Sequence, residues 1–202
     1  FIRSEFKFKS VDYSEDKCTS CGIAFTKPLI QSQTDVYESG HYKVKGFFFI
    51  PLLINIFDFF CYHFFIRIRK FNKKSAILDF GCGKGFFLYF LKKCGYSNIQ
   101  GVETSPSRAA FSKERTGLKI STDYYESGKI MDKKYDLIFL IHVLEHIPEP
   151  FLFLDNLIKG SLAKDGSLFI EVPNINSTAS KIAKKHWAHY VPQFHLNHFT
   201  IN

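Results

Sequence analysis

The chain has 202 residues, 46% of them hydrophobic, which is enough for one α/β domain and a small appendage. Its formal charge of +8 fits either a lysine-rich solvated surface or an anionic partner, such as a phosphorylated substrate or a membrane surface. No stretch interleaves basic and aromatic residues as nucleic-acid-binding motifs do, so no nucleic acid is expected. Five irregularly spaced cysteines favour a reducing, cytoplasmic location over a disulfide framework.

Residues 1–45 are weakly patterned, and their main feature is a pair of cysteines. Cys18 and Cys21 flank two residues and precede Gly22, a spacing at which a tight turn offers two thiolates to one metal ion. Structural zinc takes four ligands, and this segment has no second pair. We therefore expect half of a zinc ribbon, with Cys18 and Cys21 as metal ligands only if it is completed outside this chain. The alternative is a reduced pair in a loop.

Residues 46–74 contain a long apolar stretch, Phe47–Ile66, followed by basic residues. An aspartate near the middle of a bilayer span costs about 2.5–3.5 kcal/mol, which disfavours a transmembrane helix. We expect a lid or core helix, with a peripheral membrane or dimer contact through 47–74 as an alternative and a true span as a weaker one. Four residues at helical spacing predict a polar stripe: Pro51, Asn55, Asp58 and Tyr62.

The next stretch places glycines between two apolar runs. Ile77–Phe80 is a buried strand by composition, and glycines follow at 81, 83 and 85. Phe86–Lys93 is a helical pattern, and a second strand, Ile99–Glu103, ends in a carboxylate. A strand, glycine turn, helix and acidic strand end are typical of a nucleoside-cofactor cradle. A dinucleotide fingerprint would place a glycine at position 86, where this chain has Phe86.

Strands and helices continue to alternate after this turn. The pattern predicts a right-handed, doubly wound α/β domain over 75–202 with a mostly parallel, Rossmann-like sheet. The predicted elements are a helix from Pro106 to about Arg115, a short strand Leu118–Ser121, a strand Asp136–Ile141, a helix Phe151–Leu162, a turn Lys164–Gly166 and a strand Ser167–Val172.

Two acids at strand ends are the first candidate ligand-binding residues. Glu103 ends the second strand, where a carboxylate can accept both hydroxyls of a ribose; the alternative is a solvated acid. Asp79 is predicted either to meet a cofactor amine or to order the glycine loop through an Asx turn.

Together these motifs resemble class I S-adenosylmethionine-dependent methyltransferases. The resemblance implies a sheet of order 3-2-1-4-5 followed by an antiparallel hairpin, and the hairpin is missing from this sequence, which suggests a piece of a longer protein. The cysteine pair and the tail Trp187–Thr200 resemble a bacterial, methyltransferase-23-like subgroup associated with sugar, polysaccharide or natural-product modification. The matching core segments are Ile77–Gly85, Gly101–Pro106, Tyr135–Pro150 and Asp165–Asn174.

The resemblance implies a cofactor site and several candidate bases. Tyr124, or a neighbour, would stack on adenine, and Glu103 would hold the ribose. The candidate catalytic residues are His142, His146 and His195; the alternatives are a packed, hydrogen-bonded His146 and a His195 that packs against Trp187. The implied cofactor-binding residues are Asp79, Gly81, Cys82, Gly83, Glu103, Thr104, Tyr124, Ile141 and His142.

A helical turn would place His142, Glu145 and His146 on one face. Related quinone O-methyltransferases carry Glu in place of His142, and a metal role has been suggested for that trio, so the substitution weakens a metal interpretation here.

The sequence therefore predicts methyl transfer from S-adenosylmethionine to a hydroxyl, amine or carbon of a small-molecule or carbohydrate-linked acceptor. One alternative is an NAD-dependent oxidoreductase, which Phe86 disfavours. The other is a non-catalytic binding module that combines a zinc ribbon with a degenerate methyltransferase domain, which the intact Asp79 and Glu103 disfavour.

Overall fold

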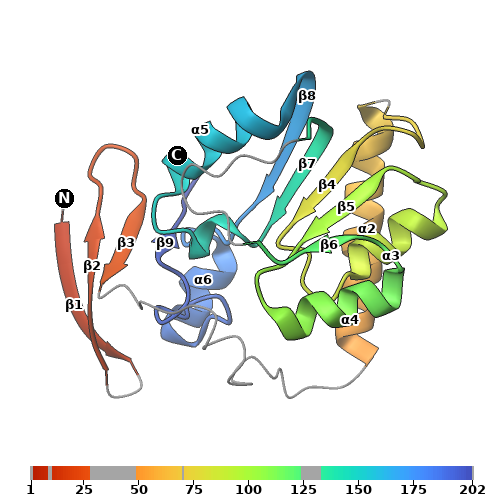
Figure 1. Cartoon of the computed structure of the whole chain (residues 1–202). Coiled ribbons are helices and arrows are strands. Elements are labelled where there is room, and N and C mark those ends of the chain that lie inside the picture. Colours follow the sequence, from red (N-terminus) through yellow and green to blue (C-terminus); the bar gives the residue numbers. More distant parts are fainter. Residues whose placement is uncertain (1, 9–10, 28–48, 70, 124–132, 202) are drawn as a thin grey trace.

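The computed structural model describes residues 2–8, 11–27, 49–69, 71–123 and 133–201. Its centre is a five-stranded parallel sheet of order β6-β5-β4-β7-β8, which confirms the predicted order 3-2-1-4-5 (Figure 1). The strands are β4 (Ile77–Phe80), β5 (Ile99–Val102), β6 (Ile120–Ser121), β7 (Tyr135–Ile141) and β8 (Leu162–Glu171).

β8 starts earlier than the sequence pattern predicts. The expected turn Lys164–Gly166 belongs to this strand, whose register against β7 shifts between the pairs Tyr135–Leu162 and Leu137–Ser167. A bulge therefore absorbs the polar residues within the strand, which a turn composition alone does not indicate.

Helices cover both faces of this sheet. Alternate residues of β4 and β7 point to opposite sides, so that Leu78 and Ile138 pack toward α5 (Pro150–Ser161) while Ile77 and Leu137 pack toward α2 and α3. The helices on the second side are α2 (Phe49–Ile68) and α3 (Phe86–Lys93), with α4 (Pro106–Thr116) beside α3.

The helix α2 packs on the sheet through an aromatic face. Phe59, Tyr62 and Ile66 are buried at helical spacing, whereas Phe60 and Phe64 are exposed. The predicted polar stripe is wrong at Tyr62, because its ring packs against aromatic side chains of α3, β7 and β8. In the part of the chain that the structure describes, none of the helices combines the length and apolar character that crossing a bilayer requires.

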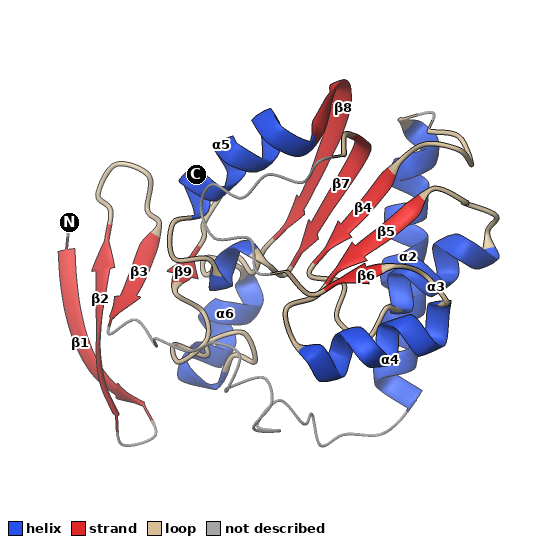
Figure 2. Ribbon diagram, in the orientation of Figure 1, coloured by secondary structure: helices blue, strands red, loops and turns tan. Residues whose placement is uncertain are grey.

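The N-terminal segment forms a second, antiparallel sheet that the sequence pattern did not predict. Its order is β1-β2-β3-β9, so the tail of the chain completes a sheet begun by the first residues (Figure 2). Arg3 and Lys27 both pair with Asp16 across neighbouring strands. The strands are β1 (Ile2–Phe8), β2 (Val11–Lys17), β3 (Ala24–Lys27) and β9 (Asn197–His198).

Three short helical segments complete the described fold near the carboxyl end of the parallel sheet. They are η1 (Leu144–His146), α6 (Thr178–Ala183) and η2 (Lys184–His186). Leu196 N donates to Glu145 O at 2.7 Å, and Thr26 N donates to Leu196 O at 2.9 Å. The tail is thus bonded on one side to η1 and on the other to β3, which joins the two sheets.

Candidate functional site

The glycine turn after β4 has the conformation expected of a ligand cradle. Gly81, Gly83 and Gly85 all have positive φ angles, of 78°, 54° and 72°. A Cβ at Gly81 would lie 2.6 Å from Val143 Cγ2, whereas a Cβ at Gly83 would meet no described atom within 4 Å. Gly81 is therefore required by packing, and Gly83 leaves its backbone open to a ligand.

Glu103 holds the glycine turn against the start of α4. Its Oε2 accepts a hydrogen bond from Gly83 N and its Oε1 accepts one from Ser105 N, each at 2.8 Å. Ser105 in turn caps α4, with Arg108 N donating to its hydroxyl. Glu103 is buried, so the alternative of a solvated acid is wrong. Each carboxylate oxygen can still accept a further hydrogen bond.

Asp79 is a buried acid beside this turn. Burial first, and the negative charge of Glu103 second, raise its pKa to about 7. A neighbouring cation would favour the ionised form and lower that pKa, because opposite charges stabilise each other at short distance. The site is therefore suited to a positively charged group such as an amine.

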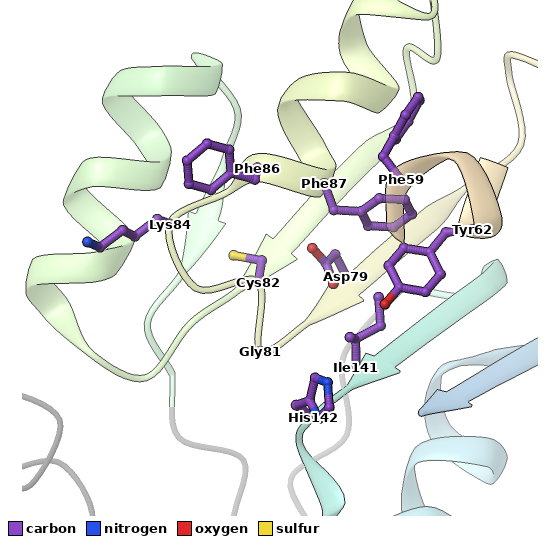
Figure 3. Close-up of a pocket in the computed structure, with 10 residues that line it drawn as sticks. All are labelled: Phe59, Tyr62, Asp79, Gly81, Cys82, Lys84, Phe86, Phe87, Ile141 and His142. Atoms are coloured by element: carbon purple, nitrogen blue, oxygen red, sulfur yellow. The ribbon is translucent and has the colours of Figure 1, made fainter. Parts of the chain in front are cut away.

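Asp79 and part of the glycine turn border a cavity of about 260 Å³ at the carboxyl end of β4 and β7 (Figure 3). Five predicted cofactor residues line it: Asp79, Gly81, Cys82, Ile141 and His142. Gly83 and Glu103 adjoin the turn through their hydrogen bond, and Thr104 follows Glu103 and is half-buried. Tyr124 lies outside the described residues.

The sequence analysis did not predict the aromatic half of the cavity wall. Phe86 and Phe87 begin α3 directly after the glycines, and Phe59 and Tyr62 come from α2 (Figure 3). The aromatic character of the residue at 86 was a usable signal, because a large side chain there must border whatever the turn binds. Lys84, between the last two glycines, also lines the cavity.

His142 stands at the end of β7 between two carboxylates. Its Nδ1 lies 3.4 Å from Glu145 Oε1, and its Nε2 lies 3.4 Å from Glu171 Oε1. Glu145 first and Glu171 second raise its pKa to about 9 against a smaller opposing effect of desolvation, so the imidazole is positively charged at neutral pH. Its φ of 54° is unusual for a residue other than glycine and aims the ring into this network.

Glu171 links this network to α2. Tyr62 Oη donates to both carboxylate oxygens of Glu171, at 3.2 and 3.1 Å. His189 stacks on His142 with ring centroids 5.5 Å apart. The sequence analysis named neither Glu171 nor His189 as a site residue, because they come from separate segments with no motif to join them.

His146 and His195 do not line the cavity and pack against each other. Their ring centroids are 4.8 Å apart, and His146 Nδ1 lies 2.8 Å from Phe194 O. Burial lowers the pKa of both rings, that of His195 to about 2. The predicted contact of His195 with Trp187 is replaced by this pair, and Trp187 contacts His189 instead.

The predicted trio of His142, Glu145 and His146 does not gather on one helical face. The segment after β7 is a single 3-10 turn that starts after His142. His195 takes the place of His142 in the cluster of possible ligands, which consists of Glu145, His146 and His195.

The cysteine pair lies in the turn between β2 and β3. Gly22 N donates to Cys18 O at 3.0 Å, and Cys18 N donates to Ile23 O at 2.8 Å. Hydrogen bonds from the backbone of Cys21 and Ser20 lower the pKa of Cys18 to about 7. Within the described ranges no third ligand gathers with these thiols, so the half ribbon stays a prediction.

Comparison with known proteins identifies similar sequences. A family model described as a methyltransferase domain matches residues 58–202. The chain is 26% identical to the "Probable (S)-tetrahydroprotoberberine N-methyltransferase 2" of Papaver bracteatum over 73% of this chain and 44% of that protein. It is 32% identical to the ubiquinone biosynthesis O-methyltransferase of Actinobacillus pleuropneumoniae serotype 7 (strain AP76) over 52% of this chain and 47% of that protein. The chain thus spans about half the length of these curated relatives.

A solved structure has the same fold. The plantazolicin methyltransferase BpumL, in complex with a pentazolic desmethylPZN analog and SAH, superposes with a TM-score of 0.60. The match covers 82% of this chain and 63% of that chain at 16% sequence identity.

Proposed function

Because the chain belongs to the S-adenosylmethionine-dependent methyltransferase family whose domain matches residues 58–202, we propose that it transfers a methyl group from that cofactor to a small-molecule acceptor. The observation that carries the proposal is the hydrogen bond that joins the glycine turn to Glu103, next to a cavity that Asp79 and His142 line.

The residues of the turn fit the cofactor. Gly83 leaves space for close approach, Glu103 has acceptor capacity left for the ribose hydroxyls, and Asp79 would pair with the amine. Cys82, Ile141 and His142 would border the methionine moiety, and Thr104 would extend the ribose side. The amino-terminal end of α3 faces the turn and favours the cofactor's carboxylate. Tyr124 remains our candidate for stacking on adenine.

Phe86 and Phe87 complete the case for this cofactor over a dinucleotide. Both line the cavity at the start of α3, where a dinucleotide fingerprint requires a glycine for close packing. An NAD-binding oxidoreductase is therefore the weaker proposal.

The cofactor supplies a methyl group on a positively charged sulfur, and this chemistry leaves orientation as the main task of the protein. Correct orientation of two reactants can contribute about 7–11 kcal/mol. His142 is charged at neutral pH, so we assign it the role of a hydrogen-bond donor that orients the acceptor rather than that of a base. A base role for His146 or His195 would require the acceptor to reach their buried cluster.

The acceptor atom is a nitrogen or an oxygen in the relatives' printed names, and carbon is the third candidate for this chain. A carbohydrate-linked acceptor is also within the proposal, since the tail and the cysteine pair resemble the subgroup associated with sugar modification. Zinc at Cys18 and Cys21 is proposed only with ligands from outside this chain.

Cofactor binding tests the proposal directly. S-adenosylhomocysteine should raise the melting temperature, whereas NAD should not. Glu103→Ala should weaken S-adenosylhomocysteine binding at least about 100-fold, because the variant loses the ribose acceptor and releases the glycine turn. The matched control is Glu114→Ala, which removes an exposed acid from α4. Stabilisation by NAD alone would overturn the proposal, and unchanged affinity in Glu103→Ala would show that the ribose lies elsewhere.

A further inference from the structure

A cluster of three side chains lies beside the cavity, and of the three only Glu145 contacts a residue with a proposed role, His142. Glu145 and His146 come from η1, and His195 comes from the tail just before β9. One ligand atom from each lies within 4.8 Å of the other two. The two segments are held together by Leu196 N, which donates to Glu145 O at 2.7 Å. The cluster is thus fixed by the backbone as well as by packing.

The buried carboxylate of Glu145 indicates that a binding partner is missing from the cluster. Its side chain is 1% exposed, and neither carboxylate oxygen has a hydrogen-bond partner among the described residues. The nearest cation is His142, whose Nδ1 lies 3.4 Å from Oε1, too long for a strong charge-assisted hydrogen bond. Buried carboxylates are normally hydrogen-bonded, paired or bound to a metal, so this one requires a further explanation.

His146 is oriented as a metal ligand would be. Its Nδ1 lies 2.8 Å from Phe194 O, and in the neutral ring this nitrogen donates the hydrogen bond. That tautomer places the acceptor lone pair on Nε2. A histidine that donates one ring N–H to a backbone carbonyl and binds with the other nitrogen is the usual arrangement in metal sites.

We propose that Glu145, His146 and His195 bind a divalent transition-metal ion of the zinc class. Two imidazoles and one carboxylate are a recurrent ligand set for zinc, and the nitrogen ligands disfavour magnesium and calcium. Tetrahedral zinc, with bonds of about 2.0–2.1 Å, holds its ligand atoms roughly 3.4 Å apart. Small side-chain rotations would therefore bring the three ligand atoms to the spacing that zinc requires.

Such an ion would neutralise Glu145 and tie the loop after β7 to the tail. The tail carries β9, which pairs with β3, so the ion would stabilise the junction between the two sheets. This inference concerns a site apart from the cofactor cavity and does not depend on methyl transfer. It also differs from the cysteine pair, which lies at the β2–β3 turn.

Metal titration of the full chain tests the site. Protein dialysed against EDTA should bind one Zn²⁺ or Co²⁺ per chain in calorimetry, and Co²⁺ should show the visible absorption of a low-symmetry site. The measurement is made in a Cys18→Ser, Cys21→Ser background, so that the thiols contribute nothing. His195→Gln should weaken binding more than about 100-fold.

His198→Gln is the matched control. His198 is also buried and lies three residues further along, but its Nε2 contacts Thr26 Oγ1 at 2.7 Å instead of the cluster. This variant should keep the metal affinity. Absence of binding in the cysteine-free background, or equal affinity in His195→Gln, would overturn the proposal.

Glu145→Gln keeps the inference testable if His195→Gln does not fold. In EDTA this variant loses the ion pair of Glu145 with His142, so the melting temperature of each protein is compared with and without Zn²⁺. Added Zn²⁺ should then raise its melting temperature less than that of the parent. An equal zinc-induced shift in both proteins would exclude Glu145 as a ligand.

Discussion

The proposed site holds its carboxylates in two different ways, in a cofactor half at the glycine turn and Glu103, and in a proposed acceptor half at Glu171 and its contacts. Glu103 accepts backbone hydrogen bonds from Gly83 and Ser105, which lie 20 and 2 residues away in sequence. Glu171 instead contacts the side chains of Tyr62, 109 residues away, and His142. A carboxylate held by backbone groups keeps its geometry when neighbouring side chains change.

This difference matches the two tasks of a transferase. A fixed cofactor needs a rigid cradle, and the parallel sheet supplies one at the carboxyl ends of its strands. An acceptor varies between relatives, and a network of side chains from separate segments can be altered one residue at a time. The contrast can be tested by comparing substitutions in the two halves.

The largest effect is expected at the glycine turn, where two neighbouring glycines have different roles. Gly81→Ala should destabilise the protein by about 2–4 kcal/mol, because its Cβ would clash with Val143 and its φ is positive. Gly83→Ala should cost only about 1 kcal/mol from backbone strain, yet it should weaken S-adenosylhomocysteine binding about 10-fold or more. Chemical denaturation and calorimetry measure the two quantities.

The two glycine variants also show which result would contradict a cofactor site at the glycine turn. If Gly83→Ala bound S-adenosylhomocysteine with unchanged affinity, the open space at Gly83 would not be where the ligand approaches. Adding Val143→Ala to Gly81→Ala should recover part of the lost stability, since only the steric part of the cost disappears.

The cofactor half was the more predictable one from sequence, for a physical reason. Ile77–Glu103 forms a contiguous unit, in which hydrophobic period, glycine positions and the terminal acid act within about thirty residues of chain. Tyr62 and Glu171 meet only because α2 packs across the sheet, and no local pattern encodes that contact. The β1–β2 hairpin escaped prediction because its few apolar positions are interleaved with charged residues of both signs.

An intermediate effect is expected from the acid beside the turn. The pKa of Asp79 is raised in the folded state to about 7, so its stabilising contribution is complete below pH ~4 and is lost as pH rises to about 7. Asp79→Asn lacks this titration, so its stability relative to the parent should increase by about 2–3 kcal/mol between pH 5 and pH 8. That corresponds to a relative rise of about 4–12 °C in melting temperature for a chain of this size.

Cofactor affinity should show the opposite trend at the same residue. A bound amine pairs with ionised Asp79, so S-adenosylhomocysteine should bind the parent protein more tightly at pH 8 than at pH 6, and this gain should disappear in Asp79→Asn. A stability difference between parent and variant that does not change with pH would contradict the buried, proton-binding state of Asp79.

The smallest effect is expected at the link between α2 and the acceptor half. Tyr62→Phe removes the hydroxyl that donates to Glu171 but keeps the ring that packs on Phe87 and Phe139. The loss should be about 1 kcal/mol, since Glu171 keeps its contact with His142. Tyr96→Phe is the matched control, because Tyr96 is also buried in this aromatic core and should cost less than about 0.5 kcal/mol.

Cofactor affinity then separates the two halves of the site. Tyr62→Phe should bind S-adenosylhomocysteine as the parent does, because the turn and Glu103 are held by backbone hydrogen bonds that this hydroxyl does not touch. Once an acceptor is identified, the Michaelis constant of Tyr62→Phe for that acceptor should be higher than that of the parent, while cofactor affinity stays constant. A parallel loss of cofactor affinity would show that α2 supports the cradle as well, and the division between a backbone-held and a side-chain-held half would have to be abandoned.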